Sequence, residues 1–388
     1  MSVSEMLTDR NWLRRFRRNL RNWYKVHARE LPWRSTSDPY RIWISEIMLQ
    51  QTTVAAVLGY YRRFLRRFGT LEQLAAASEE DVLRYWEGLG YYSRARNIHK
   101  TAKIITNDFS GQFPSDVGRL VTLPGIGQYT AGALVSFAFD IPAPIVESNT
   151  LRLYCRLLGY RGDARSSGGQ RILWDFAERI LPRQAPGRFN QALMDLGATV
   201  CTPDDPSCDS CPLRSCCRSF AEGIQREIPV SVRSAKVTSV TEAAVAIRKK
   251  TAYLLVRRNS GERWAGLWDF PRFELSDRDA PSVASTRRTA ASSPRPLTLP
   301  FKQVLEAATC EATGINAQVD EIISEIKHSV TRYRIRLLCV LARRRSGRLT
   351  AVRQAEWVVP SKFRDYPLST TGRQLANLLL ERDQNATC

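Results

Sequence analysis

Four cysteines lie within one short stretch of this chain and have the spacing of a metal-binding loop. Cys201, Cys208, Cys211 and Cys217 follow the pattern C-x6-C-x2-C-x5-C. Thiolates this close in sequence can converge on one soft metal centre, and sulfur ligands select zinc or an iron–sulfur cluster. Zinc ribbons usually have two C-x-x-C pairs, whereas only Cys208 and Cys211 form one here. The spacing therefore favours an iron–sulfur cluster over zinc, and it leaves Cys216 open as the fourth ligand.

A glycine-containing turn is the second feature with chemical meaning. Residues 123–127 read Leu-Pro-Gly-Ile-Gly and precede a segment expected to be helical from about Tyr129. Gly125 and Gly127 allow backbone N–H groups to approach a phosphate, and the following helix directs its positive N-terminal end at the same anion. Such a contact positions a protein on DNA without reading bases. An ordinary turn between helices is the alternative, and the downstream cysteines favour the DNA interpretation.

The composition indicates a polyanionic partner and a reducing compartment. The chain has 388 residues, enough for two or three domains, and 58 Lys and Arg against 38 Asp and Glu give a net charge of +20. The first thirty residues are rich in Arg and contain no apolar signal-peptide core, and no apolar run is long enough to span a membrane. We therefore expect a cytoplasmic protein without a membrane partner, in which clustered cysteines hold metal.

Hydrophobic patterning divides the chain into two domains. Residues 8–222 have apolar side chains at helical spacing, residues 223–236 are polar and basic and are expected to be a linker, and residues 237–388 combine strands with helices. Within 237–388, residues 276–298 have the composition of a disordered insertion. The predicted strands are 240–247, 252–257, 335–342 and 356–359, and the predicted helices are 304–313 and 372–381.

Several motifs together resemble the adenine DNA glycosylases of the MutY family, within the helix-hairpin-helix superfamily that includes endonuclease III. They cover most of residues 25–217 in the family's order, and the sequence 266–271 (Gly-Leu-Trp-Asp-Phe-Pro) resembles the family's nudix-like domain. Besides the four cysteines, the matching stretches are 31–34 (Leu-Pro-Trp-Arg), 45–52 (Ser-Glu-Ile-Met-Leu-Gln-Gln-Thr), 88–97 (Gly-Leu-Gly-Tyr-Tyr-Ser-Arg-Ala-Arg-Asn), 123–130 and 190–198 (Asn-Gln-Ala-Leu-Met-Asp-Leu-Gly-Ala).

The resemblance implies a fold class and an activity. The fold would be multidomain, with an all-α helix-hairpin-helix glycosylase domain that carries a [4Fe–4S] cluster loop and an α/β nudix-like C-terminal domain. The activity would be that of a monomeric, monofunctional DNA glycosylase, a hydrolase that removes adenine mispaired with 8-oxoguanine or guanine from duplex DNA in base excision repair. Two alternatives stay open: a glycosylase of the same scaffold with another mismatch or lesion specificity, and a lesion-binding protein with impaired catalysis.

The chemistry of base removal suits a pair of carboxyl groups. Breaking an N-glycosidic bond requires a proton on the leaving base and stabilisation of an oxocarbenium-like sugar, and the target nucleotide must first leave the base stack. Glu46 lies among Ile44, Ile47 and Met48, so burial would raise its pKa and keep it protonated near neutrality. A solvent-exposed position is the alternative for a lone Glu. The resemblance makes Glu46 the acid that protonates the adenine ring and then handles the incoming water.

The second carboxylate departs from the family pattern of Asp-Gly-Asn. Here the aligned residues are Glu147, Ser148 and Asn149, so the acid is one methylene longer. A displacement of about 1 Å can lower a rate on the order of a hundredfold. Related bifunctional enzymes have a Schiff-base Lys where this chain has Tyr129, which predicts a monofunctional enzyme without efficient strand cleavage by β-elimination. Tyr129 is expected to hydrogen-bond the acidic pair.

The resemblance also assigns residues that contact DNA. Gln51 and Tyr91 match side chains that wedge into the stack near the lesion, and Arg29 and Arg34 are expected to position the strand or the pocket. The helix hairpin would contribute Gly125 and Gly127.

The lesion-recognition loop is the second departure from the family. Where relatives have Phe-Ser-His-x-His, this chain has His328-Ser329-Val330-Thr331-Arg332. Thr331 and Arg332 are expected to donate hydrogen bonds to the modified guanine. The segment 304–314 contains only Glu306 and Glu311, too few acids for a magnesium-dependent nudix hydrolase, so no pyrophosphatase activity is expected.

Overall fold

The chain forms two compact units, and it enters the second of them twice. A computed structural model describes residues 9–230, 237–259, 261–276, 297–330, 332–350 and 354–385. The first unit comprises Met1–Ala77 and Ser93–Arg233, and the second comprises Ser78–Tyr92 and Ser234–Cys388. The sequence analysis placed a single division at residues 223–236. It did not assign Ser78–Tyr92 to the C-terminal part of the chain.

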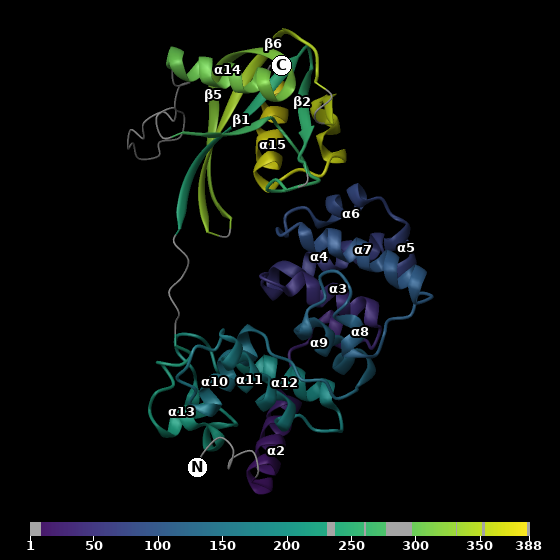
Figure 1. Cartoon of the computed structure of the whole chain (residues 1–388), viewed down its shortest axis with the longest axis vertical. Helices are drawn as coiled ribbons and strands as arrows, with labels where there is room; N and C mark the ends of the chain where they lie inside the picture. Colours follow the sequence, from purple (N-terminus) through teal and green to yellow (C-terminus); the bar gives the residue numbers. More distant parts are fainter. Residues whose placement is uncertain are drawn as a thin grey trace. The chain divides into compact units, whose positions relative to one another are not determined.

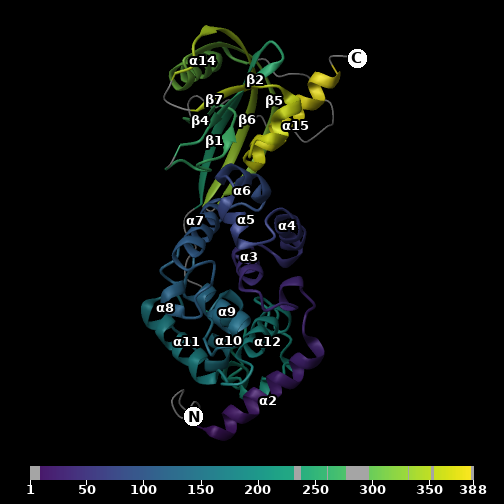
Figure 2. The same ribbon diagram turned by 90° about the vertical axis from the view of Figure 1, so that its right-hand side faces the viewer.

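The first unit is helical, as its apolar spacing predicts. Side-chain oxygens begin several helices; Asp38, Thr53 and Ser166 each accept a hydrogen bond from a backbone N–H of the following turn. Helices α9 to α12 lie together in this unit (Figure 2). The described helices and 3-10 turns are α2 (Arg10–His27), η1 (Pro32–Arg34), α3 (Pro39–Leu49), α4 (Val54–Arg67), α5 (Leu71–Ala76), α7 (Ser93–Asp108), α8 (Val117–Leu120), α9 (Gln128–Phe139), α10 (Ser148–Leu158), α11 (Ser167–Ile180), α12 (Pro186–Thr199), η2 (Cys208–Ser210), η3 (Arg214–Cys216) and α13 (Arg218–Ala221).

Close backbone contact holds α10 and α12 together. A Cβ atom on Gly197 of α12 would lie 2.8 Å from the backbone oxygen and 2.9 Å from the Cβ of Asn149 in α10. Only glycine permits this approach, since real Cβ contacts are longer. The apolar faces of α10, α11 and α12 also enclose one core with Phe16 and Leu20 of α2. The segment that carries Asn149 is therefore held against a fixed neighbour.

The second unit is built on a seven-stranded sheet. The strand order is β3-β2-β1-β6-β5, while β4 pairs with β1 and β7 pairs with β2. The long pair β1 and β6 is parallel, and the other pairs are antiparallel. Its elements are α6 (Glu79–Trp86), β1 (Thr238–Lys249), β2 (Ala252–Arg257), β3 (Trp268–Asp269), β4 (Arg272–Leu275), α14 (Leu299–Thr313), β5 (Ile315–Val330), β6 (Tyr333–Gly347), β7 (Ala355–Val358), η4 (Pro360–Asp365) and α15 (Thr370–Asn385).

Both faces of this sheet are covered, because successive residues of a strand point to opposite sides. Val245 of β1 packs in one core with Leu305 of α14, whereas its neighbours Ala244 and Ala246 pack in another core with Leu375 of α15. Helices α14 and α15 accordingly lie on opposite faces of the sheet (Figure 1). This double covering explains the almost continuous apolar run in β1.

Most of the predicted elements of the C-terminal part are present, and β5 is the main omission. The predicted strands correspond to β1, β2, β6 and β7, and the predicted helices to α14 and α15. The β5–β6 pairing contains irregularities between Asn316 and Ala317, Val319 and Glu321, and Ile322 and Ser324. These bulges interrupt the alternation of apolar and polar residues that a search for strands relies on.

Two predicted segments fall mainly outside the described residues: the insertion at 276–298, and the second half of the linker at 223–236. Among the described residues, no helix is both long and apolar enough to cross a membrane.

The close contact between α10 and α12 leads to a testable difference between two glycines. Gly197→Ala should lower the free energy of unfolding by about 1–3 kcal/mol, because the added methyl group forces the helices apart. Gly168→Ala is the matched control, since a Cβ at this exposed position of α11 meets no atom within 4 Å. The control should be neutral or slightly stabilising, by up to about 1 kcal/mol. Urea unfolding of both variants measures the difference, and equal effects would contradict the proposed constraint.

Candidate active site

A cavity of about 440 Å³ in the first unit is lined by all four predicted catalytic residues. Glu46 reaches it from α3, Tyr129 from the first turn of α9, and Glu147 and Asn149 from the start of α10. The other described residues that line it are Arg29, Leu31, Trp33, Arg34, Ile42, Leu49, Gln50, Gln51, Thr52, Thr53, Val54, Phe137, Val146, Ser148, Gln191, Met194 and Ala198. The two acids that the sequence analysis paired therefore share one cavity.

Glu46 is a buried carboxyl group with one defined partner. It is 3% exposed, and the hydroxyl of Tyr129 donates a hydrogen bond of 2.6 Å to its Oε2. Burial raises the pKa of Glu46 to about 7; the bond from Tyr129 and the charge of Arg34 oppose this shift, and the charge of Glu147 adds to it. Near neutrality Glu46 is thus poised between acid and base.

Tyr129 remains a neutral hydrogen-bond donor. Its side chain is half-buried, and desolvation together with the nearby Glu46 and Glu147 raises its pKa well above the usual range. No lysine is among the described residues that line the cavity. The cavity therefore offers acid–base groups but no amine for a Schiff base.

Glu147 caps the N-terminus of α10. Its Oε2 accepts a 2.9 Å hydrogen bond from the N–H of Asn149, its Oε1 accepts one of 2.9 Å from the N–H of Thr150, and Thr150 Oγ1 accepts one of 2.8 Å from the N–H of Glu147. Burial raises the pKa of Glu147, while the two backbone bonds and Arg152 oppose the shift. The longer side chain thus keeps a fixed carboxyl group at the cavity wall by making a capping box.

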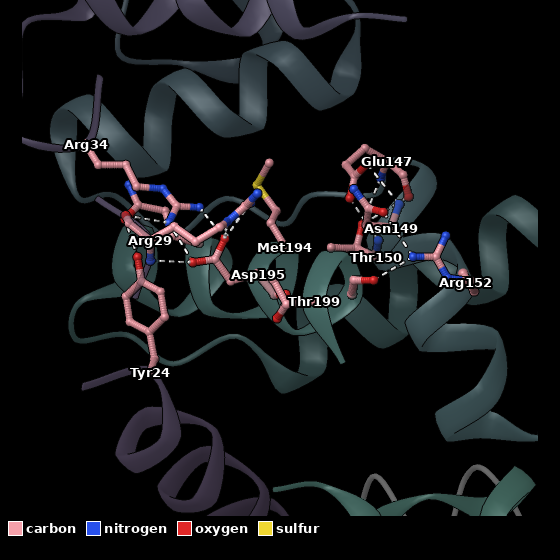
Figure 3. Close-up of polar contacts among 12 residues, drawn as sticks. Tyr24, Arg29, Arg34, Glu147, Asn149, Thr150, Arg152, Met194, Asp195 and Thr199 are labelled. Atoms are coloured by element: carbon pink, nitrogen blue, oxygen red, sulfur yellow. Dashed lines mark hydrogen bonds and ion pairs between the residues drawn. The ribbon is translucent and has the colours of Figure 1, made fainter. Parts of the chain in front are cut away.

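Arg152 connects this wall with the cysteine loop. Its Nη2 donates to Asn149 Oδ1 at 3.0 Å (Figure 3). The same Nη2 donates to the Gly197 carbonyl at 2.6 Å, and Nε donates to the Cys201 carbonyl at 2.8 Å. The amide of Asn149 is therefore oriented by a buried guanidinium group. The sequence analysis did not single out Arg152.

A second set of charges is organised by Asp195 of α12. Its fully buried carboxylate pairs with Arg34 through Nη1 at 2.6 Å and Nη2 at 2.7 Å, and with Arg29 through Nε at 2.6 Å (Figure 3). These arginines lower the pKa of Asp195, although burial alone would raise it. Arg29 and Arg34 are thereby fixed as cavity-lining cations. Asp195 itself was missed, and its only signal was an acid between Met194 and Leu196 in an otherwise apolar stretch.

The predicted DNA-contacting loops have unusual backbone conformations. Gln51 borders the cavity with a φ of 57°, and Tyr91, which belongs to the second unit, has a φ of 48° and is 46% exposed. Arg94, another residue missed in the sequence, donates from Nη1 to the carbonyls of Ile47 and Met48 at 2.9 and 3.1 Å. It also donates to the carbonyl of Gln50, so it holds the end of α3 and the loop that follows.

The hairpin before α9 requires its first glycine for two reasons. Gly125 has a φ of +77°, and a Cβ there would lie 2.8 Å from the Cβ of Asn97. Gly127 precedes α9 without a side-chain cap, and a Cβ at Gly127 would meet open space. The first turn of α9 accordingly presents backbone N–H groups that its own cap residue leaves unpaired.

The four predicted ligand cysteines line one small cavity beside α10. Cys201, Cys208, Cys211 and Cys217 all border it, whereas the buried Cys216 does not. Burial raises the pKa of Cys211 to about 12 and that of Cys217 to about 11, so a bound cation would be needed to ionise these thiols. Among the described residues, no three potential ligands are yet gathered at metal-binding distances. The donor set nevertheless has the softness and number that an iron–sulfur cluster requires.

Arg156 of α10 anchors the loop that carries these cysteines. This arginine is 2% exposed, and its guanidinium donates to the carbonyls of Thr202 and Pro203 at 2.6 and 2.7 Å, to the Ile228 carbonyl at 2.8 Å, and to Cys201 Sγ at 3.4 Å. Helix α10 thus carries two buried arginines, four residues apart, that both bind the cysteine loop.

Comparison with known proteins agrees with this geometry. Residues 44–179 match the HhH-GPD superfamily of base excision DNA repair proteins, and residues 243–378 match the NUDIX domain. The chain is 38% identical over 254 residues to the adenine DNA glycosylase of Buchnera aphidicola subsp. Schizaphis graminum, a match that covers 65% of this chain and 73% of that protein. The chain belongs to the adenine DNA glycosylase family.

Other members of this family are similar over shorter parts of their length. The adenine DNA glycosylase of Rattus norvegicus is 45% identical over 213 residues, which is 53% of this chain and 41% of the rat protein. Among solved structures, a thermostable thymine-DNA glycosylase has a TM-score of 0.50 and 29% identity, over 54% of this chain and 97% of that one. This adenine DNA glycosylase family member is thus a multidomain base excision repair glycosylase with a helical HhH-GPD domain and a nudix-like domain.

Membership also bears on the cysteines and on the second unit. Glycosylases of this family generally carry a [4Fe–4S] cluster. In the nudix-like domain, Arg332 follows β5 at the turn into β6; its Nη2 donates to the Tyr333 hydroxyl at 3.1 Å, and Thr331 lies outside the described residues. Glu306 of α14 accepts a hydrogen bond of 2.9 Å from the N–H of Val319, so one of the two acids considered for magnesium has a structural role.

The burial of Glu46 makes the stability of this glycosylase depend on pH. The folded pKa of about 7 exceeds the ordinary value of 4.5, so the folded state binds the proton more tightly than the unfolded state. The stability contributed by protonated Glu46 is therefore fully present below about pH 4.5 and is lost as the pH rises to about 7, by on the order of 3 kcal/mol at most. Glu46→Gln removes this loss, because an amide does not ionise.

The variant should melt at a higher temperature than the wild type at pH 8 and at nearly the same temperature at pH 5. Glu178→Gln, at an exposed position of α11, is the control and should show no such difference between the two pH values. Identical melting temperatures of wild type and Glu46→Gln at pH 8 would contradict the assigned burial.

Proposed function

We propose that this chain removes adenine from duplex DNA in which the adenine is mispaired with 8-oxoguanine or guanine. The observation that carries the proposal is the cavity shared by Glu46 and Glu147, in which the first is a buried carboxyl group poised near neutrality and bonded to Tyr129. Names of similar proteins support adenine as the base. All four proposed catalytic residues come from one unit of one chain, so the proposed reaction by a monomer needs no residue from a second copy.

The reaction divides between the two acids. Glu46 gives its proton to the adenine ring, and the electron pair of the breaking C1′–N bond leaves with the base. Glu147, whose carboxyl group is fixed at the cavity wall by the N–H groups of Asn149 and Thr150, stabilises as a carboxylate the positive charge that develops on the sugar. The Glu46 carboxylate then accepts a proton from the water that attacks C1′, which restores the acid. Asn149, oriented by Arg152, positions the sugar or the water.

The absence of a lysine among the described residues of the cavity supports a monofunctional enzyme. Hydrolysis by this route leaves an abasic site with both strands intact, since strand cleavage by β-elimination needs a covalent amine intermediate. Tyr129 acts as a donor that holds the Glu46 carboxyl group in place.

Contacts to the rest of the DNA fall to three groups of residues. The start of α9, after Gly125 and Gly127, would bind a phosphate with backbone N–H groups. Gln51 and Tyr91 would fill the stack from which the adenine leaves. Thr331 and Arg332 would read the 8-oxoguanine, since an arginine pairs well with purine acceptors.

The cysteine loop would hold a [4Fe–4S] cluster through Cys201, Cys208, Cys211 and Cys217. A bound cluster would cross-link the segment 201–217, whose carbonyls Arg152 and Arg156 already bind from α10. We assign it a structural role, because four thiolate ligands leave no open position for substrate.

Base release from three defined duplexes tests the proposed activity. In single-turnover assays, adenine should be released from A opposite 8-oxoguanine and A opposite G, fastest from the first, with no release of thymine from T opposite G. Glu46→Gln should lower the rate by about 10²–10⁴-fold with unchanged DNA affinity, because it removes the acid and keeps the shape. Glu178→Gln serves as the control. Release only from T opposite G would contradict the proposal, and tight binding without release would favour a lesion-binding protein.

Single substitutions of two adjacent cysteines test which of them binds the cluster. Cys217→Ser should lose the visible absorption of an iron–sulfur cluster and most of the bound iron, because it removes a ligand. Cys216→Ser should keep both, because Cys216 does not border the shared cavity. Absorption spectra with iron and sulfide analysis measure this. Loss of iron in the Cys216 variant alone would contradict the assignment, and zinc in place of iron would contradict the choice of metal.

A further inference from the structure

Helix α6 is attached to the C-terminal part of the chain by a half-buried ion pair. Glu87, the residue that ends α6, binds Arg373 of α15 through both carboxylate oxygens: Arg373 Nε donates to Oε1 at 2.6 Å and Nη2 to Oε2 at 2.9 Å. The N–H of Leu368 donates to the same Oε2 at 3.2 Å. The side chains of Glu87 and Arg373 are only 16% and 23% exposed, so water screens this pair less than a surface pair.

A second anchor lies on the same face of α6. Trp268 of β3 is 1% exposed, and its Nε1–H donates a hydrogen bond of 2.6 Å to Glu80 Oε1. Glu80 and Glu87 are seven residues apart, about two helical turns, and so face the same direction. Their partners are also neighbours, because Trp268 and Leu368 form a β-bridge. Two charged residues of α6 thus meet one continuous site in the nudix-like domain.

Arg373 is held in place independently of Glu87. Its Nη1 donates to the Phe363 carbonyl at 2.8 Å and its Nη2 to the Tyr366 carbonyl at 2.7 Å. The planar guanidinium group is therefore already oriented toward Glu87 by the backbone around η4, which lowers the entropy lost when the pair forms. Arg373 and the backbone around it therefore form a preorganised binding site for the Glu87 carboxylate.

The loop that follows Glu87 has a strained and closely determined conformation. Gly88 and Gly90 have positive φ of 97° and 70°, and Tyr91 adopts 48°, which is uncommon for a residue with a Cβ. The Trp86 Nε1–H donates to the Gly90 carbonyl at 3.1 Å, and the N–H of Gly88 donates to the Tyr92 hydroxyl at 3.3 Å. The loop nevertheless leaves the Tyr91 side chain 46% exposed. Strain of this kind persists only where the surrounding structure maintains it.

We propose that Arg373 is a positioning residue: by binding Glu87 it fixes the loop Gly88–Tyr92, so that the C-terminal domain holds Tyr91 in the conformation that enters the DNA base stack. The inference rests on the proposed function for the role of Tyr91. The effect of the Glu87–Arg373 ion pair on the loop, which we call the pin, can be measured without DNA. On this proposal the nudix-like domain has a second role besides lesion recognition. It fixes the conformation of residues 88–92, which lie in the sequence between helices of the glycosylase domain.

Hydrogen exchange of the free, full-length, cluster-loaded protein tests the pin directly. Glu87→Ala removes the carboxylate and leaves Arg373 its two carbonyl partners, so the C-terminal domain should remain folded. Amides of Gly88–Tyr92 should exchange at least about tenfold faster in Glu87→Ala and in Arg373→Met, and no faster again in the double variant, since both changes break one interaction. Arg382→Met, elsewhere on α15, is the matched control and should leave exchange in this loop unchanged, because Arg382 pairs with Glu321 instead.

Base release then tests the consequence for DNA. With A opposite 8-oxoguanine, Tyr91→Ala and Glu87→Ala should each slow single-turnover release by a similar factor, and the double variant should be no slower than Tyr91→Ala alone. Unchanged loop exchange in Glu87→Ala and Arg373→Met would overturn the pin. Faster exchange with release slowed by Tyr91→Ala but not by Glu87→Ala would overturn its role in positioning Tyr91. A wild-type protein that releases no base would instead contradict the proposed function, while the exchange results would still decide on the pin.

Discussion

The backbone contact between α10 and α12 is the constraint on which the candidate site depends. Gly197 allows α12 to approach Asn149 to a distance that no other residue would permit. This single approach places the start of α10, with Glu147 and Asn149, against the stretch of α12 that carries Asp195. Arg152 then fastens the contact by binding Asn149 and the Gly197 carbonyl together. Packing between α10 and α12 thus determines where the polar groups of the cavity wall lie.

Electrostatics inside the cavity follow from this enclosure. Desolvation raises the pKa of Glu46 and Glu147, whereas the Asp195 carboxylate stays ionised because two arginines satisfy it. Burial and ion pairing therefore shift the pKa values of neighbouring acids in opposite directions. Arg29 and Arg34 pair with Asp195, and the charge of Arg34 opposes the effect of burial on the pKa of Glu46 without cancelling it.

Local sequence predicted those elements and site residues that are determined by residue type and spacing. Helical spacing predicted the first unit, and the cysteine pattern together with the family motifs led to the shared cavities around Glu46 and Cys201. Residues that act through distant partners escaped notice, because nothing near Asp195, Arg152 or Arg94 in sequence reveals the groups they bind. The bulged strand β5 and the membership of Ser78–Tyr92 in the second unit were missed for related reasons: bulges remove the period-two signal, and pairing across the chain leaves no local pattern.

The ion pair between Glu87 and Arg373 joins residues 286 positions apart, which has a consequence for biosynthesis. A ribosome adds about 5–20 residues per second, so roughly 15–60 s separate the emergence of these two side chains. During that interval Glu87 has been synthesised and Arg373 has not. The nascent helical region must therefore form without the Glu87–Arg373 ion pair, and the turn before α7 can acquire its final form only after Arg373 has been synthesised.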